Sequence, residues 1–205
     1  MSEPQAVAES LEEVVPGVFH WRVADERIGG YTSAAHAVRG DDGAFVLIDP
    51  LALDDADLAR LEPVEAIVLT AATHQRSAWR YRARFGAPVH VPEGSRETDE
   101  EPDAHYGAGA VLPGGLKAVH APGPEQPHYA LLLERGEGVL FCPDHLMRGP
   151  DGALMFVPGE FHEDPAETRR TVEALLDLPF SVLCLDHGAP LADDPKGALS
   201  ALLAS

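Results

Sequence analysis

The sequence predicts an α/β protein built as a four-layer αββα sandwich, in which two sheets pack face to face and helices cover their outer faces. In each half of the 205 residues, segments rich in β-branched and aromatic residues come first and helical patterns follow them. Two such halves bury their apolar faces by packing sheet on sheet. The hydrophobic fraction of 45% is enough to fill a core, and the length suits one domain of about 100–200 residues. We therefore expect a single domain over residues 1–205.

The first half is predicted to open with a meander of antiparallel strands and to continue with alternating helices and strands. Gly-Gly and Gly-Asp-Asp-Gly turn signals separate the opening strands, which are expected at 14–23, 31–38 and 44–49. The next elements are a short helix at 54–63, an apolar strand at 65–70, a helix at 76–86 and a strand at 88–92. Residues after Thr70 thus follow the carboxyl end of a buried strand, where open α/β sheets bind ligands.

The second half begins with an acidic segment, 93–107, that holds few apolar residues and is predicted to be an exposed loop. Short strands are expected after it, at 110–112, 116–120, 128–134 and 138–142. A helix then begins after Asp164, its N-cap, because Pro165 suits the first helical position and Glu167 stands three residues after the cap. The last elements are a strand at 181–186 and a helix capped by Asp194.

The composition is strongly acidic, because 34 Asp and Glu against 15 Lys and Arg give a formal net charge of −19. Such a charge repels nucleic acid phosphates and anionic lipid surfaces, so neither is an expected partner. No run approaches the ~18 apolar residues of a membrane helix, and the acidic first residues do not resemble a secretion signal. We expect a cytoplasmic protein. Cys142 and Cys184 each lie in an apolar run and are predicted to be buried thiols.

Polar side chains gather where three of the predicted strands end. They occupy residues 70–76, 142–145 and 186–188. Strand ends belong to a rigid scaffold, which can hold several side chains in convergent geometry. Candidate catalytic or binding residues are therefore expected at these three places.

These segments resemble the metallo-β-lactamase superfamily, which includes thioester hydrolases of the glyoxalase II type. The resemblance covers nearly the whole chain, and each motif stands in the family's order and at roughly its spacing. The motifs are VVPGVFHW, FVLIDP, EAIVLT, RFGAPVHVP, VHAPGP, VLFCPDHL and VLCLDHG. The resemblance implies the αββα fold. It also implies hydrolysis at two zinc or similar ions, which polarise a carbonyl group and lower the pKa of a bridging water to about 7.

Most of the metal ligands that the resemblance implies are replaced in this sequence. Members of the family usually bind metal through a Thr-His-x-His-x-Asp-His run, a His after Pro-Gly, an Asp that ends a later strand and a final His before Gly. Thr70 matches the start of the run, and Asp144 and His187 match the last two ligands. The other ligand positions hold Ala71, Thr73, Gln75, Arg76 and Pro124. Because Ala, Pro and Arg side chains offer no lone pair to zinc, the dinuclear site is expected to be absent.

A semi-buried Asp144 without metal ions needs another cation beside it. We hypothesise that the guanidinium of Arg76 takes the place of a metal ion and forms an ion pair with Asp144, completed by His187. The alternative is that Arg76 points to solvent together with the arginines at 80, 82 and 84.

Two further histidines are candidates for the same pocket. His74 directly follows an apolar strand and is predicted to be a base or a lone metal ligand, with an ordinary loop position as the alternative. His128 begins a strand close after a Pro-Gly-Pro turn and is predicted to bind ligand. His145 neighbours Asp144, but adjacent residues on a strand face opposite sides. His162 is interpreted as part of a solvated turn.

Two classes of function stay open at this point. In the first, the protein is a pseudoenzyme that binds a small molecule without any cofactor, with an anion on Arg76 as one candidate. In the second, it hydrolyses thioesters, lactones or related esters with one zinc, iron or manganese ion, or with Asp144 and His187 as an acid/base pair. Asp144, His187 and His74 are the predicted catalytic residues, and Arg76 and His128 are the predicted ligand-binding residues. Asp144 and His187 are also the residual candidates for holding a metal ion.

Overall fold

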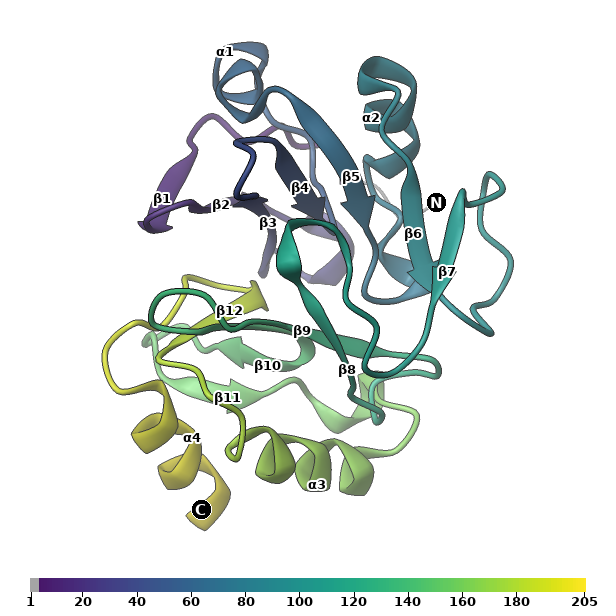
Figure 1. The fold of residues 1–205 in the computed structure, drawn as a ribbon. Helices are drawn as coiled ribbons and strands as arrows, with labels where there is room; N and C mark the ends of the chain where they lie inside the picture. The colour runs from purple at the N-terminus through teal and green to yellow at the C-terminus, as the bar shows by residue number, and fades with distance from the viewer. Residues whose placement is uncertain (1–3) are drawn as a thin grey trace.

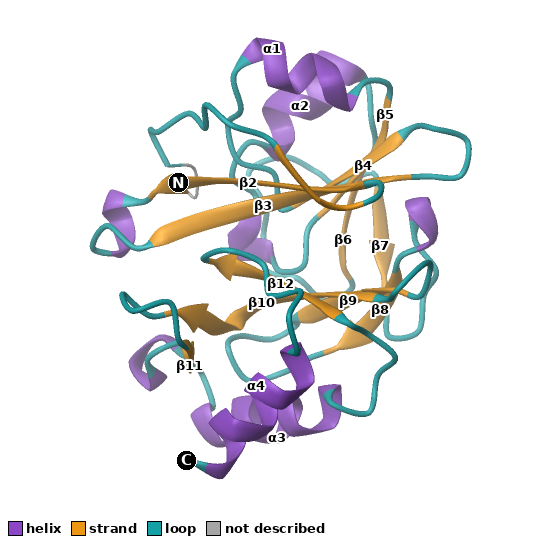
Figure 2. Cartoon of the chain, turned by 90° about the vertical axis from the view of Figure 1, so that its left-hand side faces the viewer, coloured by secondary structure: helices purple, strands orange, loops and turns teal. Residues whose placement is uncertain are grey.

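Two β-sheets stack against each other and helices cover their outer faces, as Figures 1 and 2 show. The computed structural model describes residues 4–205. The first sheet contains, in spatial order, β1 (Glu12–Val15), β2 (Val18–Ala24), β3 (Thr32–Arg39), β4 (Phe45–Ile48), β5 (Val64–Val68), β6 (Val89–Pro92) and β7 (Ala104–Tyr106). Helices α1 (Asp55–Leu58) and α2 (Ala78–Phe85) lie on its outer face.

The second sheet is built around its longest strand, β10. Its strands are β8 (Lys117–His120), β9 (Tyr129–Leu133), β10 (Val139–Arg148), β11 (Leu154–Phe156) and β12 (Val182–His187). Strand β10 pairs antiparallel with β9 and β11 and parallel with β12. Helices α3 (Pro165–Leu175) and α4 (Pro195–Ala204) cover the outer face (Figure 1). The predicted αββα architecture is therefore confirmed.

Three clusters of buried apolar side chains separate the four layers. The first, under α1 and α2, includes Leu47 and Ile67. The second fills the space between the sheets and includes Ile48 and Phe141. The third, under α3 and α4, includes Val172. Leu47 and Ile48 are adjacent on β4 yet belong to different clusters, because successive side chains of a strand point to opposite faces. The sheets are thus buried on both faces.

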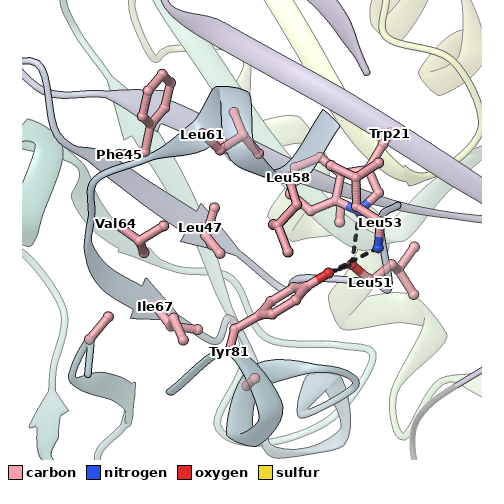
Figure 3. Close-up of a cluster of buried hydrophobic side chains, with 14 of the residues drawn as sticks. Trp21, Phe45, Leu47, Leu51, Leu53, Leu58, Leu61, Val64, Ile67 and Tyr81 are labelled. Atoms are coloured by element: carbon pink, nitrogen blue, oxygen red, sulfur yellow. Dashed lines mark hydrogen bonds between the residues drawn. The ribbon is translucent and has the colours of Figure 1, made fainter. Parts of the chain in front are cut away.

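The cluster under α1 and α2 also satisfies the polar atoms of its large aromatic side chains (Figure 3). The carbonyl oxygen of Leu51 accepts hydrogen bonds from Trp21 Nε1 and from the Tyr81 hydroxyl, each at 3.0 Å. The Tyr81 hydroxyl accepts one from the Leu53 amide at 2.9 Å. These bonds hold the segment that follows β4, so the core fixes the position of Asp49, two residues before Leu51.

The sequence predictions for helix caps and cysteines hold in the structure. The Asp164 side chain accepts a hydrogen bond from the Glu167 amide at 2.9 Å, which caps α3 as predicted. Cys142 and Cys184 are buried free thiols, and burial raises the pKa of both. Among the helices of residues 4–205, none has the length and apolar composition needed to cross a membrane.

The acidic segment 93–107 differs in part from its prediction as a loop. Its residues Ala104–Tyr106 form β7, which pairs in parallel with β6. Tyr106 is buried, and its hydroxyl donates a hydrogen bond to the Leu69 carbonyl at 2.7 Å. Residues 104–106 are too few to show a strand pattern in the sequence. They form a strand because they pair with β6, which is a tertiary contact.

Gly138 allows the start of β10 to approach the segment before β12 closely. Its φ is +75°, and a Cβ atom at this position would lie 2.2 Å from the Pro179 carbonyl oxygen. Its own carbonyl accepts hydrogen bonds from the amides of Ser181 and Val182 at 3.0 and 3.1 Å. This contact aligns β10 with β12.

Gly138→Ala is expected to lower the free energy of unfolding by about 3 kcal/mol or more. A left-handed backbone costs a non-glycine residue about 1–2 kcal/mol, and the steric clash adds to that cost. Gly136→Ala is the matched control, because its φ is +65° but an added Cβ meets none of the described atoms within 4 Å. Urea unfolding followed by circular dichroism measures both variants. Equal losses of stability would contradict the close approach at Gly138.

Candidate functional site

Six polar residues, from the ends of β4, β5 and β12 and from the middle of β10, meet at one edge of the sandwich. Strands β4 and β5 run parallel, so the residues after them lie at the same edge. Strands β10 and β12 bring the remaining ones from the second sheet. We call the six residues the charge cluster; they are Asp49, His74, Arg76, Asp144, Asp186 and His187. The three segments singled out in the sequence lie together here, but 142–145 is not a strand end as predicted, because β10 continues to Arg148 after the bulge.

A bulge in β10 presents Asp144 to the cluster. The pairing register of β10 with β12 shifts between Cys142 and Met147, so β10 carries extra residues opposite the end of β12. Asp144 lies among these residues and has a φ of +56°. Bulges redirect side chains in this way and occur often beside active sites.

The backbone of the charge cluster is strained at three residues. Asp49, Arg76 and Asp144 have φ values of +45°, +39° and +56°. In residues 4–205 the only other non-glycine residue with positive φ is the helix cap Asp194. Left-handed backbone costs about 1–2 kcal/mol per residue. Such strain persists only where the surrounding structure compensates for it, and it collects at functional sites.

Arg76 is a fully buried cation at the base of the cluster. Its Nη2 lies 2.8 Å from Asp186 Oδ2, and both side chains are only 4% exposed. Its Nη1 donates hydrogen bonds to the carbonyls of Ala34 and Asp49 at 2.6 and 3.0 Å. Burial alone would lower the pKa of Arg76, but the carboxylates of Asp186, Asp49 and Asp144 outweigh it and raise that pKa. The guanidinium is therefore charged at every pH at which the protein is folded.

The predicted ion pair of Arg76 with Asp144 is wrong in its partner, which is Asp186. Asp144 acts on the guanidinium as a nearby negative charge. The reason is burial: Asp186 is 4% exposed and Asp144 is 22% exposed, and the more deeply buried carboxylate has the greater need of a paired cation. The alternative, in which Arg76 points to solvent, is excluded by its burial. Its guanidinium is likewise closed to an anion from solution.

His74 has carboxylate oxygens at both of its ring nitrogens. Nδ1 lies 3.1 Å from Asp49 Oδ2, and Nε2 lies 2.9 Å from Asp144 Oδ2. Ionised carboxylates only accept hydrogen bonds, so two carboxylates at the two nitrogens favour an imidazolium ring with a proton on each nitrogen. Burial alone would lower the pKa of His74, but the charges of Asp144 and Asp49 raise it well above the usual value. His74 is therefore the second cation of the cluster.

His187 has the same arrangement on the other side of Asp144. Its Nδ1 lies 3.0 Å from the Thr32 carbonyl oxygen, and its Nε2 lies 3.1 Å from Asp144 Oδ1. Burial would lower the pKa of His187, but the hydrogen bond and charge of Asp144 raise it. Burial would raise the pKa of Asp144, but the charge of His74 and hydrogen bonds from neighbouring histidines hold it well below its usual value. Three carboxyl groups thus face three cationic side chains.

The residues of the cluster do not fit a metal ion in this arrangement. In the described part of the chain, the ligand atoms that lie within 4.8 Å of one another belong to Asp49, His74 and Asp186. Asp186 already holds the Arg76 guanidinium, and a protonated His74 has no lone pair for a metal. A metal dication bound to Asp186 would be repelled by the Arg76 guanidinium, which lies 2.8 Å from the same carboxylate. Asp144 and His187, the residual candidates, are hydrogen bonded to each other.

Two side chains at positions where the family resemblance implies metal ligands make contacts elsewhere. The Gln75 amide oxygen accepts hydrogen bonds from Trp79 Nε1 at 2.8 Å and from the Asp99 amide at 2.6 Å. The Thr73 hydroxyl donates to Glu125. These side chains have structural partners of their own.

Three more histidines surround Asp144. His128, predicted to bind ligand, is buried with Nε2 3.7 Å from Asp144 Oδ2, and this nitrogen has no hydrogen-bond partner among the described residues. The His145 ring packs on that of His128 at 5.0 Å, and burial lowers the pKa of His145 to about 3. His162, interpreted as part of a solvated turn, has Nε2 2.9 Å from the Asp144 carbonyl oxygen. Of these, His128 alone points a free nitrogen at the cluster.

Asp49 lies in none of the three polar segments marked in the sequence, and Asp186 lies in one of them without being named as a candidate residue. Each ends an apolar strand, in the runs FVLID and VLCLD. A charged residue directly after a fully apolar strand is the signal that marks both.

Two adjoining cavities open beside the cluster, and we call them together the cleft. The smaller, of about 210 Å³, has Asp144 and His187 in its wall. Its apolar wall includes Ile28, Tyr31, Met147, Val157, Pro158 and Phe161. The larger, of about 720 Å³, shares Tyr31, Met147 and His187 with it. Asp144 and His187 are thus the cluster residues that a bound molecule can reach.

Comparison with known families assigns this architecture. A model described as the metallo-beta-lactamase superfamily matches residues 10–186, which is most of the chain. The chain therefore belongs to the metallo-β-lactamase superfamily, as the sequence motifs indicate. A search of curated proteins gives no match.

Solved structures of the family share the fold at low sequence identity. A metallo-beta-lactamase family protein from Thermus thermophilus has 19% identity and a TM-score of 0.69, over 94% of this chain and 80% of its own. A metallo-beta-lactamase from Pontibacter korlensis has 16% identity and a TM-score of 0.73, over 96% and 99%. The metallo-beta-lactamase FIM-1 from Pseudomonas aeruginosa, solved in a mono-zinc form, has 15% identity and a TM-score of 0.72, over 100% and 98%. These likenesses concern the fold.

Arg76→Ala is expected to lower the free energy of unfolding by about 3–5 kcal/mol, because it leaves Asp186 buried without its cation. Arg80→Ala, at an exposed position on α2, is the control and should change stability by about 1 kcal/mol or less. Urea unfolding at pH 7 compares the two. Equal effects would show that Arg76 does not neutralise buried carboxylates.

The raised pKa values of His74 and His187 predict a loss of stability as the pH rises. From about pH 6.5 up to the pKa in the fold, the unfolded chain loses protons that the folded chain retains. The free energy of unfolding then falls by up to about 1.4 kcal/mol per pH unit for each histidine. His74→Gln should flatten the decline between pH 6.5 and 8.5 in urea titrations. The exposed His105→Gln is the control; an unchanged slope in His74→Gln would refute the charged form of His74.

Proposed function

We propose that this chain is a metal-independent member of its superfamily that binds a small molecule in the cleft, a pseudoenzyme whose two-metal centre has been replaced by protein cations. The observation that carries the proposal is the buried ion pair of Arg76 with Asp186, at 2.8 Å. It supplies a fixed positive charge among three carboxyl groups. The imidazolium groups of His74 and His187 supply the rest.

The composition of the cluster supports the same conclusion. A metal site needs neutral histidines and deprotonated carboxylates, so that lone pairs point at the ion. In this chain both nitrogens of His74 and His187 face acceptors, which makes them donors. Each carboxylate oxygen of Asp144 accepts one of these protons. The cluster is therefore complete without an added ion.

The residues that meet the bound molecule are Asp144 and His187, which line the smaller cavity. Thr32 and Asp144 engage both N–H groups of His187, so it meets the molecule as a positioned charged ring. The bulge in β10 holds Asp144. His74 and Arg76 act from beneath by fixing the charge and position of these two groups. Under this proposal Arg76 is a structural cation instead of a direct ligand contact.

A second candidate function is hydrolysis of thioesters, lactones or related esters. The observation that favours it is His128, whose buried Nε2 lies 3.7 Å from Asp144 Oδ2 and lacks a hydrogen-bond partner in the described part of the chain. A free nitrogen so placed suits one zinc, iron or manganese ion beside Asp144, or a proton relay through Asp144 and His187.

Metal content separates the two candidates. Untagged protein, expressed with added zinc, iron and manganese and then dialysed, should contain close to zero metal per chain by inductively coupled plasma mass spectrometry. It should also fail to hydrolyse a generic thioester such as S-lactoylglutathione. The wild type and the variants Asp144→Ala and His128→Ala should give the same metal content.

About one equivalent of metal, lost in Asp144→Ala or His128→Ala, would overturn the metal-independent proposal. Thioester turnover abolished by a chelator would establish the hydrolase with one metal. Turnover that resists the chelator but is lost in His187→Gln would establish the acid/base hydrolase.

A further inference from the structure

The larger cavity of the cleft is lined without any acidic side chain. The chain carries 34 Asp and Glu residues, yet within residues 4–205 none of them lines this cavity of about 720 Å³. The charged side chains in its wall are Arg22, Arg148 and His187. A cavity lined by one sign of charge concentrates ions of the opposite sign, so this one favours anions although the protein is acidic.

Arg148 is held in this wall by backbone groups. Its Nε, Nη1 and Nη2 donate hydrogen bonds to the carbonyls of Ala189, Gly152 and Pro190 at 3.3, 2.9 and 3.4 Å. A guanidinium has five N–H groups, so two are left over. Neutral carbonyls position the group but do not cancel its charge.

Gly188 provides the space for the Arg148 side chain. Its φ is +116°, and a Cβ atom there would lie 2.5 Å from Arg148 Cγ. Any larger residue at position 188 would displace the arginine. The arginine therefore occupies a position that the end of β12 is shaped to accept.

Arg22 reaches the same cavity from the first sheet. Along β2 it alternates with Trp21, which is buried under α1 and α2, so Arg22 faces the second sheet with His20. Burial, aided by the charge of Arg22, lowers the pKa of His20 to about 4. The neutral His20 adds no charge beside Arg22 on this face.

Most arginines in this chain have a carboxylate partner. Arg82 lies 2.7 Å from Asp103, and Arg135 lies 2.7 Å from Asp41. Neither Arg22 nor Arg148 forms an ion pair within residues 4–205, although acidic residues are more than twice as numerous as basic ones. Arg39 and Arg169 also lack an ion pair there, but Arg22 and Arg148 share one cavity, and two such guanidinium groups suit an anion.

We propose that Arg22 and Arg148 form an anion-binding subsite, and that the cleft takes a small molecule with a carboxylate or phosphate head and an apolar tail. The head lies between the arginines, and the tail lies against Val157, Pro158 and Phe161 in the smaller cavity. His187 lies where the two cavities join. This inference rests on the proposed function, since it specifies the ligand of the same cleft.

The test compares probes that differ only in the head or the tail. Octanoate and octyl phosphate carry both features, octanol lacks the charge, and propionate lacks the tail. Isothermal titration calorimetry on the full chain should show that at least one of the two anions binds about tenfold or more tightly than octanol and propionate. The preferred anion tells whether the head is a carboxylate or a phosphate.

Two variants and one control locate the charge preference. Arg22→Gln changes an exposed strand residue, and Arg148→Gln removes the positioned guanidinium. Each should bring the affinity for the anionic probe to within about twofold of that for octanol, while octanol binding stays unchanged. Arg39→Gln, at an exposed position on β3 outside both cavities, should bind as the wild type does.

Each negative result in these binding experiments contradicts a different part of the proposal. Equal binding of octanol and both anions, or unchanged anion binding in Arg22→Gln and Arg148→Gln, would overturn the subsite while leaving a ligand-binding cleft. Absence of binding for every probe would overturn the subsite together with the cleft as a site for amphipathic molecules. A bound metal ion would instead contradict the proposed function and leave the charge preference measurable.

Discussion

The burial of three carboxyl groups at one edge of the sandwich is the constraint that organises this site. Ionised carboxylates away from water cost several kcal/mol each unless cations and hydrogen bonds compensate. Arg76 compensates Asp186 directly, and His74 lies between Asp49 and Asp144. His187 completes the balance from β12. The contacts between opposite charges offset the strained backbone at Arg76 and Asp144, whose φ values are +39° and +56°.

Under the proposed function, in which side chains take the place of metal ions, the protonation of the site is the reverse of that in a metal centre. In a metal centre the histidines are neutral and donate lone pairs, and binding of the ion releases protons. Here the imidazoles of His74 and His187 retain protons because carboxylates and a carbonyl accept from them. An arginine adds a charge that no accessible pH removes. A family fold can thus keep the geometry of its strand ends while changing the chemistry that those ends support.

The fold was predictable from the sequence to a greater extent than the site. Alternating apolar patterns and capping residues such as Asp164 act locally, so the layers and most elements follow from short stretches of chain. The partner of Arg76 depends on how far the β10 bulge displaces Asp144 relative to Asp186 on β12, and no local pattern encodes that distance. The strand at 104–106 was missed for the same reason, since it forms only by pairing with β6.

The charge balance of the cluster also determines which small molecules the cleft can bind. With Asp49, Asp144 and Asp186 neutralised from within, the potential felt by a bound molecule is set by the unpaired Arg22 and Arg148. The net charge of −19 repels anions at long range, but salt screens that repulsion over about 8–10 Å, whereas a contact with a positioned guanidinium is screened less. An anion without an apolar part therefore gains little binding free energy from the arginines alone. Burial of an apolar tail adds further binding free energy and makes binding specific.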